Sequence, residues 1–317
     1  SGKTSVITRK IAYLVQQCRI PAHRITAMTF TNKAAREMKE RVGKLLSREE
    51  AKGLSVSTFH TFGLNLLRLE LKHTPLKANF SILDADDCKR ILMDLMHRDN
   101  LSGAESKELI ARAMKMISDW KNDLIPPEQA HTTCETPEDI QMAHLYQLYE
   151  RNLRAYNAVD FDDLIVMPTR LLQENAEVRD KWQNRVRYLL VDEYQDTNTA
   201  QYILVKLLVG VMGQFTAVGD DDQSIYAWRG AIDALETPNG PVLPLSTSFR
   251  FPQEIANIAM EAASHSPLGG LGFDLVGAGT GQTTLKNDLR YACICRTNTG
   301  VLFTAERLAE KGKSFSV

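Results

Sequence analysis

The chain has 317 residues, of which 44% are hydrophobic and 24% are charged, as in ordinary globular proteins. This composition excludes a disordered, collagen-like or disulfide-framework protein, and the length fits about two domains. No stretch approaches the roughly 18 apolar residues of a membrane-spanning helix, and residues 1–9 lack the plan of a signal peptide. We therefore expect a cytoplasmic protein and no membrane partner.

Charge is distributed unevenly along the chain. The sequence carries 38 Lys and Arg against 39 Asp and Glu, but residues 1–72 carry 14 basic against 5 acidic residues. A locally basic segment is typical of proteins that bind polyanions such as nucleic acids. A solvated helix face explains the charge equally well when charge is taken alone.

The first part of the chain alternates helix and strand signals. Residues 5–14 continue helically, residues 24–30 form a short β-leaning run, and residues 34–46 place apolar residues at helical spacing. The pattern becomes almost purely helical from about residue 63 to residue 172. Strand signals return at residues 188–191 and 215–218, and both apolar runs end in acidic residues. This order predicts an α/β fold with a parallel sheet that an all-helical insertion interrupts.

Composition changes again after Ala231. Three prolines stand close together at positions 238, 241 and 244, and six glycines lie between Gly269 and Gly281. Proline and glycine punctuate regular structure, so we expect a domain boundary near residue 237.

The chain opens on Ser1-Gly2-Lys3-Thr4, the end of the phosphate-binding pattern Gly-x-x-x-x-Gly-Lys-[Ser/Thr]. In such a loop the backbone N–H groups and the helix N-terminus hold phosphate oxygens. Lys3 would reach the β- and γ-phosphates of ATP, and the Thr4 hydroxyl would ligate Mg²⁺. Four residues are a weak signal on their own.

A second motif supplies the missing partner. The apolar run 188–191 leads into Asp192 and Glu193. Asp192 would hold the same Mg²⁺ as Thr4, and Glu193 would act as the general base that polarises the attacking water. The alternative, two solvated acids at the end of a buried strand, leaves the opening motif unexplained. The pair of motifs therefore predicts a nucleoside-triphosphate hydrolase.

Longer strings accompany these two motifs. They are TFTNKAAREM at 29–38, STFHTFG at 57–63, ISDWKND at 117–123, DFDDL at 160–164, VDEYQDTN at 191–198 and VGDDDQSIYAWRGA at 218–231. With them the chain resembles the superfamily 1 DNA helicases of the Rep/UvrD type, in order, from residue 1 to about 231. Beyond that point LSTSFRF at 245–251 and CRTN at 295–298 look more like the F-box DNA helicase branch.

The resemblance implies an architecture and an activity. The expected fold is a RecA-like P-loop NTPase motor domain (1–62 and 174–236) with an inserted helical subdomain (63–173) and part of a second RecA-like domain (237–317). The expected enzyme binds and hydrolyses ATP with Mg²⁺, moves on single-stranded DNA, 3′ to 5′ by family, and unwinds duplex DNA. DNA repair and DNA replication are its expected settings. Protein partners stay unknown.

The resemblance also assigns site residues. Gln223 would sense the γ-phosphate and Arg250 would act as an arginine finger, although a surface charge is the alternative for Arg250. The implied DNA contacts are Phe30, Asn32, His60, Tyr226 and Trp228. Aromatic side chains stack on unpaired bases of any sequence, which suits a motor. Two further aromatics, Phe59 and Phe62, fit a core position as well as a base contact.

Two other functions remain open at this point. One is the helicase subunit of a helicase-nuclease, which a nuclease domain downstream would decide. The other is a non-hydrolysing DNA-binding fragment, because the sequence begins inside the phosphate loop and ends before the later motifs of a second motor domain. We expect a sequence truncated at both ends from a complete helicase.

Overall fold

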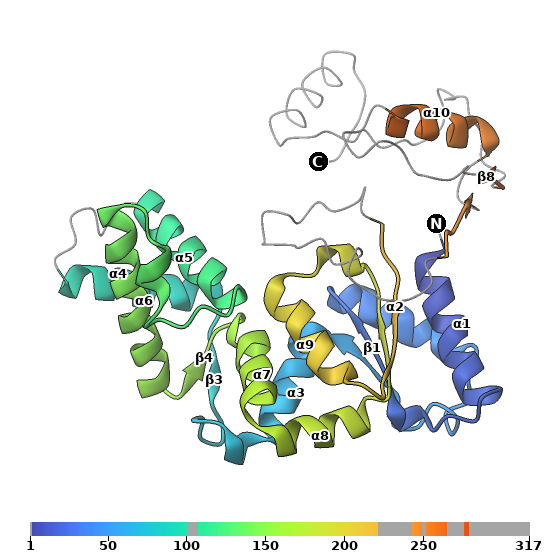
Figure 1. The fold of residues 1–317 in the computed structure, drawn as a ribbon, viewed down its shortest axis with the longest axis horizontal. Coiled ribbons are helices and arrows are strands. Elements are labelled where there is room, and N and C mark those ends of the chain that lie inside the picture. The colour runs from blue at the N-terminus through green and yellow to red at the C-terminus, as the bar shows by residue number, and fades with distance from the viewer. Residues whose placement is uncertain (1, 100–106, 221–242, 249–251, 265–275, 279–317) are drawn as a thin grey trace, which may run out of the picture. The chain divides into compact units, whose positions relative to one another are not determined.

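The computed structural model describes residues 2–99, 107–220, 243–248, 252–264 and 276–278 (Figure 1). Residues Gly2–Leu243 form one compact unit, and residues 244–317 form another. In the described part of the chain, no helix is both long and apolar enough to cross a membrane.

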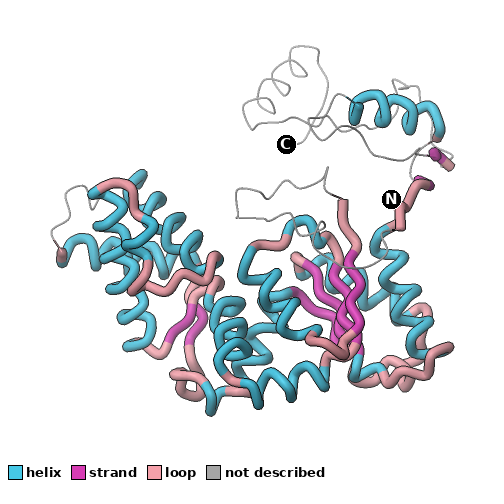
Figure 2. Tube along the Cα trace, viewed as in Figure 1, coloured by secondary structure: helices cyan, strands magenta, loops and turns pink. Residues whose placement is uncertain are grey.

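A parallel four-stranded sheet lies at the centre of the first unit (Figure 2). Its strand order is β2 (Ser55–Thr58), β1 (Ile25–Thr29), β5 (Tyr188–Val191) and β6 (Gln214–Ala217). In the register, Ile25 pairs with Tyr188 and Thr26 with Ser55. All five residues of β1 are buried, as expected for a central strand that is covered on both faces. The parallel sheet predicted from the sequence is confirmed, and β5 occupies the predicted residues.

Helices cover both faces of this sheet (Figure 1). On one face α1 (Lys3–Gln16) and α2 (Asn32–Gly43) enclose a core that contains Ile11, Ile25 and Leu190. On the other face α3 (Phe59–Leu69), α7 (Asp163–Glu174), α8 (Ala176–Arg185) and α9 (Thr199–Val209) share a core with Met28 and Leu189. Successive strand residues point to opposite faces, so a few apolar residues per strand supply both cores.

The inserted part has a separate core. It is built from α4 (Ala85–Arg98), α5 (Lys107–Asn122) and α6 (Pro137–Ala155). Trp120 stacks on Tyr146 with ring centroids 5.8 Å apart. The sequence did not predict the two short strands beside these helices, β3 (Ser81–Ile82) and β4 (Ala158–Val159), which pair in parallel. Two residues per strand are too few for a period-2 pattern to show.

The helices at the two ends of the expected range 63–173 pack with the sheet. Phe62 of α3 and Ile165 of α7 lie in the same core as Met28. The helices approach closely at Gly63, where an added Cβ would lie 1.7 Å from the carbonyl oxygen of Leu164. The domain boundaries stay a prediction, but the insertion's own core runs only from Cys88 to Ala158.

The second unit is described in three short elements. They are β7 (Thr247–Ser248), α10 (Gln253–Ser264) and β8 (Val276–Gly277). Strand β7 pairs in parallel with β8, and α10 contacts β8.

Candidate functional site

The opening motif begins helix α1. Gly2 precedes the first turn with φ at 98°, a left-handed conformation that glycine adopts without strain. It has no side chain to cap the turn, and Lys3 and Thr4 are the first two helical residues. Backbone N–H groups at such an end attract phosphate. Ser1, the other predicted loop residue, lies outside the described residues.

The two predicted motifs meet in the fold, although 188 residues separate Thr4 from Asp192. The Thr4 hydroxyl donates to Oδ2 of Asp192 at 3.1 Å, and Nζ of Lys3 lies 2.5 Å from Oε2 of Glu193. Asp192 directly follows β5, and its backbone N–H donates to the carbonyl of Met28 in β1. The carboxyl end of the sheet therefore delivers both acids to the start of α1.

The two neighbouring acids have different environments. Asp192 is 3% exposed, and burial raises the pKa of its carboxyl, with the adjacent charge of Glu193 adding to the effect. Hydrogen bonding from Thr4 and the charge of Lys3 act in the opposite direction. The side chain of Glu193 is 38% exposed, so water can reach it. This pair thus combines a buried carboxylate with a carboxylate that water can reach.

Gln195 is a residue of this site that the sequence analysis missed. Its Nε2 donates to Oε2 of Glu193 at 2.9 Å, and its Oε1 accepts the backbone N–H of Asp220 at 3.1 Å. It connects the candidate base to the segment after β6. Its place two residues after Glu193, within VDEYQDTN, was the available signal.

The donor set suits Mg²⁺ and phosphate. Mg²⁺ prefers oxygen ligands, and Thr4 and Asp192 present a hydroxyl and a carboxylate within 3.1 Å of each other. Lys3 adds a cation at the same place. Open space surrounds the Cα of Gly2, where an added Cβ would have no heavy atom within 4 Å.

The described DNA-contact candidates lie at the same edge of the sheet. Phe30 follows β1, and exposed Asn32 begins α2. His60 lies in the first turn of α3, directly after β2. The two alternative aromatics, Phe59 and Phe62, are buried in the sheet core, so their side chains cannot stack on bases. Phe30 packs against Phe59 with ring centroids 5.2 Å apart.

Phe161 is a second residue that the sequence analysis did not select. It is 52% exposed, and its ring meets that of His60 edge-on, with centroids 6.2 Å apart. A bulky aromatic among the acids of DFDDL was the available signal. The predicted residues Gln223, Tyr226, Trp228 and Arg250 lie outside the described residues.

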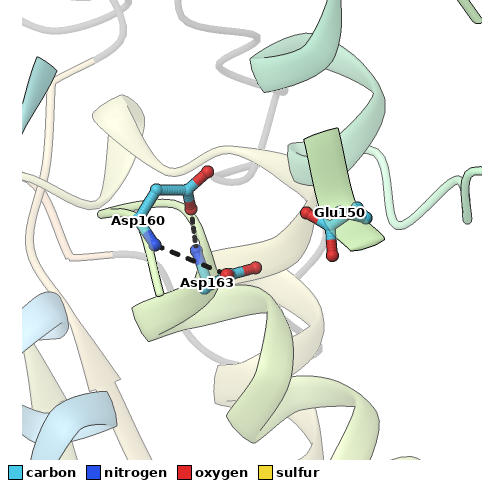
Figure 3. A group of neighbouring side chains, drawn as sticks. All are labelled: Glu150, Asp160 and Asp163. Carbon is cyan, nitrogen blue, oxygen red and sulfur yellow. Dashed lines mark hydrogen bonds between the residues drawn. The ribbon is translucent and has the colours of Figure 1, made fainter. Parts of the chain in front are cut away.

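Three carboxylates close to Phe161 form a cluster, drawn in Figure 3, from Glu150, Asp160 and Asp163. Each offers an oxygen within 4.8 Å of the others, a spacing that would suit a metal ion. The ammonium of Lys121 already lies among them, at 2.6 Å from Glu150, 2.7 Å from Asp160 and 2.9 Å from Asp163. Burial disfavours this charge, but Asp160 and Asp163 hold the pKa of Lys121 well above its usual value. The lysine supplies the cation that this cluster needs.

Comparison with known proteins identifies the family. Residues 1–235 match the model of the UvrD/REP helicase N-terminal domain. The ATP-dependent DNA helicase Rep of Escherichia coli (strain K12) is 50% identical over 273 residues, covering 84% of this chain and 40% of Rep. PcrA of Staphylococcus epidermidis (strain ATCC 12228 / FDA PCI 1200) is 40% identical over 273 residues, again 84% of this chain and 37% of PcrA. A probable DNA helicase II homolog of Mycoplasma capricolum is 43% identical over 233 residues, covering 73% of this chain and 32% of that protein.

The chain therefore belongs to the UvrD/REP helicase family, and the predicted RecA-like α/β motor fold with inserted helices is confirmed. It spans 40% or less of the length of these relatives. The similarity of the later part to the F-box helicase branch stays a prediction.

Proposed function

We propose that this chain carries the ATP-hydrolysing part of a DNA helicase that moves 3′ to 5′ along single-stranded DNA and unwinds duplex DNA. One observation carries the proposal: Lys3 and Thr4 meet Glu193 and Asp192 at the carboxyl edge of the sheet. The names of the relatives Rep and PcrA, both ATP-dependent DNA helicases, support it. The cytoplasmic location stays a prediction.

The contacts suggest how the site would work. The ammonium of Lys3 contacts the carboxylate of Glu193. The β- and γ-phosphate oxygens of ATP would compete for this ammonium, which would free Glu193 to accept a proton from the attacking water. Bound Mg²⁺, held through Thr4 and Asp192, would neutralise phosphate charge. Gln223 and Arg250 complete the proposed site as γ-phosphate sensor and arginine finger.

The DNA path is proposed along the same edge of the sheet. Phe30, Asn32 and His60 each stand at the beginning or end of an element there, with Phe161 beside His60. Stacking on aromatic rings is worth about 1 to 3 kcal/mol per base and tolerates any sequence. Tyr226 and Trp228 are the remaining proposed contacts.

Glu193→Gln in the full-length protein tests the assignment. The amide keeps the size of the side chain and removes only the base, so ATP should still bind while phosphate release with single-stranded DNA should stop. Glu177→Gln, an exposed position in α8, is the matched control and should retain activity. Near-normal phosphate release by Glu193→Gln would show that another group activates the water.

A further inference from the structure

The segment that carries Glu193 ends at Asn198, which caps helix α9. Oδ1 of Asn198 accepts the backbone N–H of Gln201 at 2.9 Å, and the Gln201 side chain accepts the N–H of Asn198 in return. The remaining polar group of the Asn198 side chain is Nδ2, which donates to Oδ1 of Asn122 at 2.8 Å. The cap therefore fixes Asn198 in an orientation that reaches α5.

Asn122 is the last residue of α5, and it is 9% exposed. Its Nδ2 donates to Oδ1 of Asp162 at 2.9 Å and to the carbonyl of Ser118 at 2.9 Å. A second hydrogen bond, from Thr199 to Asp123 at 3.0 Å, joins the same two helix ends. The amide of Asn122 thus lies between the segment after β5 and the loop before α7.

That loop holds Phe161 between anchored acids. Asp160 accepts hydrogen bonds from Lys121 and Tyr149, and Asp163 accepts from Lys121 and Arg154. The N–H of Asp163 donates back to Oδ1 of Asp160 at 2.9 Å, one of the two bonds drawn in Figure 3. These bonds hold the backbone on both sides of Phe161, so the position of its Cα depends on Asp160 and Asp163.

We propose that Asn122 is a positioning residue that couples segment 193–198 to the loop that carries Phe161. The proposal rests on the proposed function, since Glu193 would respond to nucleotide and Phe161 would contact DNA. A shift of segment 193–198 must either move Asn122 or break a buried amide hydrogen bond. Leaving a buried polar group unpaired is costly, so the two segments move together.

Asn198→Asp in the full-length protein removes the hydrogen bond to Asn122, keeps the bond from Thr199 to Asp123, and adds one negative charge. Aspartate caps a helix as well as asparagine, so α9 keeps its cap, but the Nδ2 donor is lost. In its present orientation, Asn122 would lose the hydrogen bond to residue 198. If its amide rotated, Nδ2 could donate to the new carboxylate, but Oδ1 would then face Asp162 and that hydrogen bond would be lost. One hydrogen bond is lost in either orientation.

The measurement is the affinity for single-stranded DNA with and without a non-hydrolysable ATP analogue. The ratio of the two affinities reports the coupling between the sites. We expect Asn198→Asp to reduce this ratio by about three- to tenfold, the effect of one net hydrogen bond. The rate of ATP hydrolysis without DNA should stay close to that of the unaltered protein.

Two further variants make the result specific. Asn175→Asp makes the same change at the cap of α8, where Oδ1 accepts the N–H of Val178, and should leave the ratio unchanged. In a Phe161→Ala background Asn198→Asp should have little additional effect, because both changes interrupt one connection.

The outcomes separate the two proposals. A loss of thermal stability in Asn198→Asp with an unchanged affinity ratio would reduce Asn122 to a structural contact and overturn the coupling alone. An unaltered protein whose DNA affinity does not respond to nucleotide would contradict the proposed function and the coupling together.

Discussion

Two lysine–carboxylate sites in the first unit differ in burial. Among the described residues, the ammonium of Lys3 contacts one carboxylate, that of Glu193, and the two side chains are 14% and 38% exposed. The side chain of Lys121 is 1% exposed, and its ammonium contacts three carboxylates. The first is a contact that an incoming anion can replace, because water already reaches it. Water does not reach the ammonium of Lys121 in this way, and removal of this cation would leave buried negative charges close together.

The difference in burial distinguishes the proposed catalytic site from a buried structural cluster. A partly exposed pair contributes less to stability than a buried cluster, so its residues are available to bind a ligand. A buried cluster holds its elements in fixed positions, here the ends of α5, α6 and α7. Four substitutions test this contrast.

Lys3→Ala should produce the largest effect of the four substitutions. It should lower ATP turnover without changing stability. Loss of a cation on the transferring phosphoryl group should lower ATP turnover by about 10³-fold or more. The unfolding midpoint should hardly move, since the pair with Glu193 is partly exposed. Phosphate release and thermal unfolding are the two measurements. Lys10→Ala, at an exposed position of the same helix, is the control. A large loss of stability in Lys3→Ala would contradict the contrast.

Lys121→Met should have the opposite profile. The side chain keeps its approximate length but loses its charge, so the free energy of unfolding should fall by about 3 to 5 kcal/mol. Burial already raises the pKa of Asp160 and of Glu150, and removal of the cation should raise both further. An acid whose pKa is raised in the folded state binds a proton more tightly there than in the unfolded chain. The stability lost in Lys121→Met should therefore increase as the pH rises through the folded-state pKa values of Asp160 and Glu150.

Urea unfolding over a range of pH measures this deficit. Lys115→Met, which removes an exposed lysine paired with Asp119 on the same helix, is the control and should change stability little. A loss of stability in Lys121→Met that did not vary with pH would mean that the ammonium of Lys121 does not influence the pKa values of these carboxylates.

Phe161→Ala tests whether the buried cluster also serves DNA binding. Removal of one stacking ring should weaken binding of single-stranded DNA by about 1 to 3 kcal/mol. Stability should change little, because the ring is 52% exposed. A fluorescence titration measures the affinity, and Tyr156→Ala, an exposed aromatic after α6, is the control. Equal affinities for the two variants would remove Phe161 from the proposed DNA path.

The contrast also shows what the sequence could reveal. Asp192 and Glu193 were predictable, because an apolar run followed by acids is a local pattern with a direct structural meaning. Lys121 carried a weaker signal, since it stands four residues after buried Ile117 and so on the apolar face of α5. Its three partners lie 29 to 42 residues along the chain, and no helical or strand period indicates such pairings.

Other features depended on packing. Helix α3 packs with the sheet and with α7, which approaches it closely at Gly63. The local sequence pattern does not reveal this packing. The side-chain bond between Asn122 and Asn198 spans 76 residues, although both residues stand in strings that the family resemblance had marked. The family resemblance predicted that both strings are functional, but only the fold shows that the two side chains are in contact.

Glu70→Gln should give the smallest effect, because glutamine still accepts the hydrogen bond from Trp182. In burial, the pair of Glu70 and Lys181 is intermediate between the two sites. Its carboxylate is 1% exposed, but its partner Lys181 is 60% exposed. Oε1 of Glu70 accepts from Nζ of Lys181 at 2.6 Å and from Nε1 of Trp182 at 2.9 Å. Burial alone would raise the pKa of Glu70, but these two donors and the charge of Lys181 hold it below the usual value.

An acid with a lowered pKa stabilises the fold above its unfolded value, near 4.3, and loses that contribution as the pH falls through the folded value. Glutamine keeps the acceptor for Trp182 and removes only the charge, so the cost at neutral pH should be about 1 kcal/mol. Urea midpoints of Glu70→Gln and of the exposed control Glu174→Gln should therefore differ at neutral pH and converge in acid. Midpoints that differed equally at both would assign the effect to altered packing around Trp182, and Glu70 would then belong with neither ionic site.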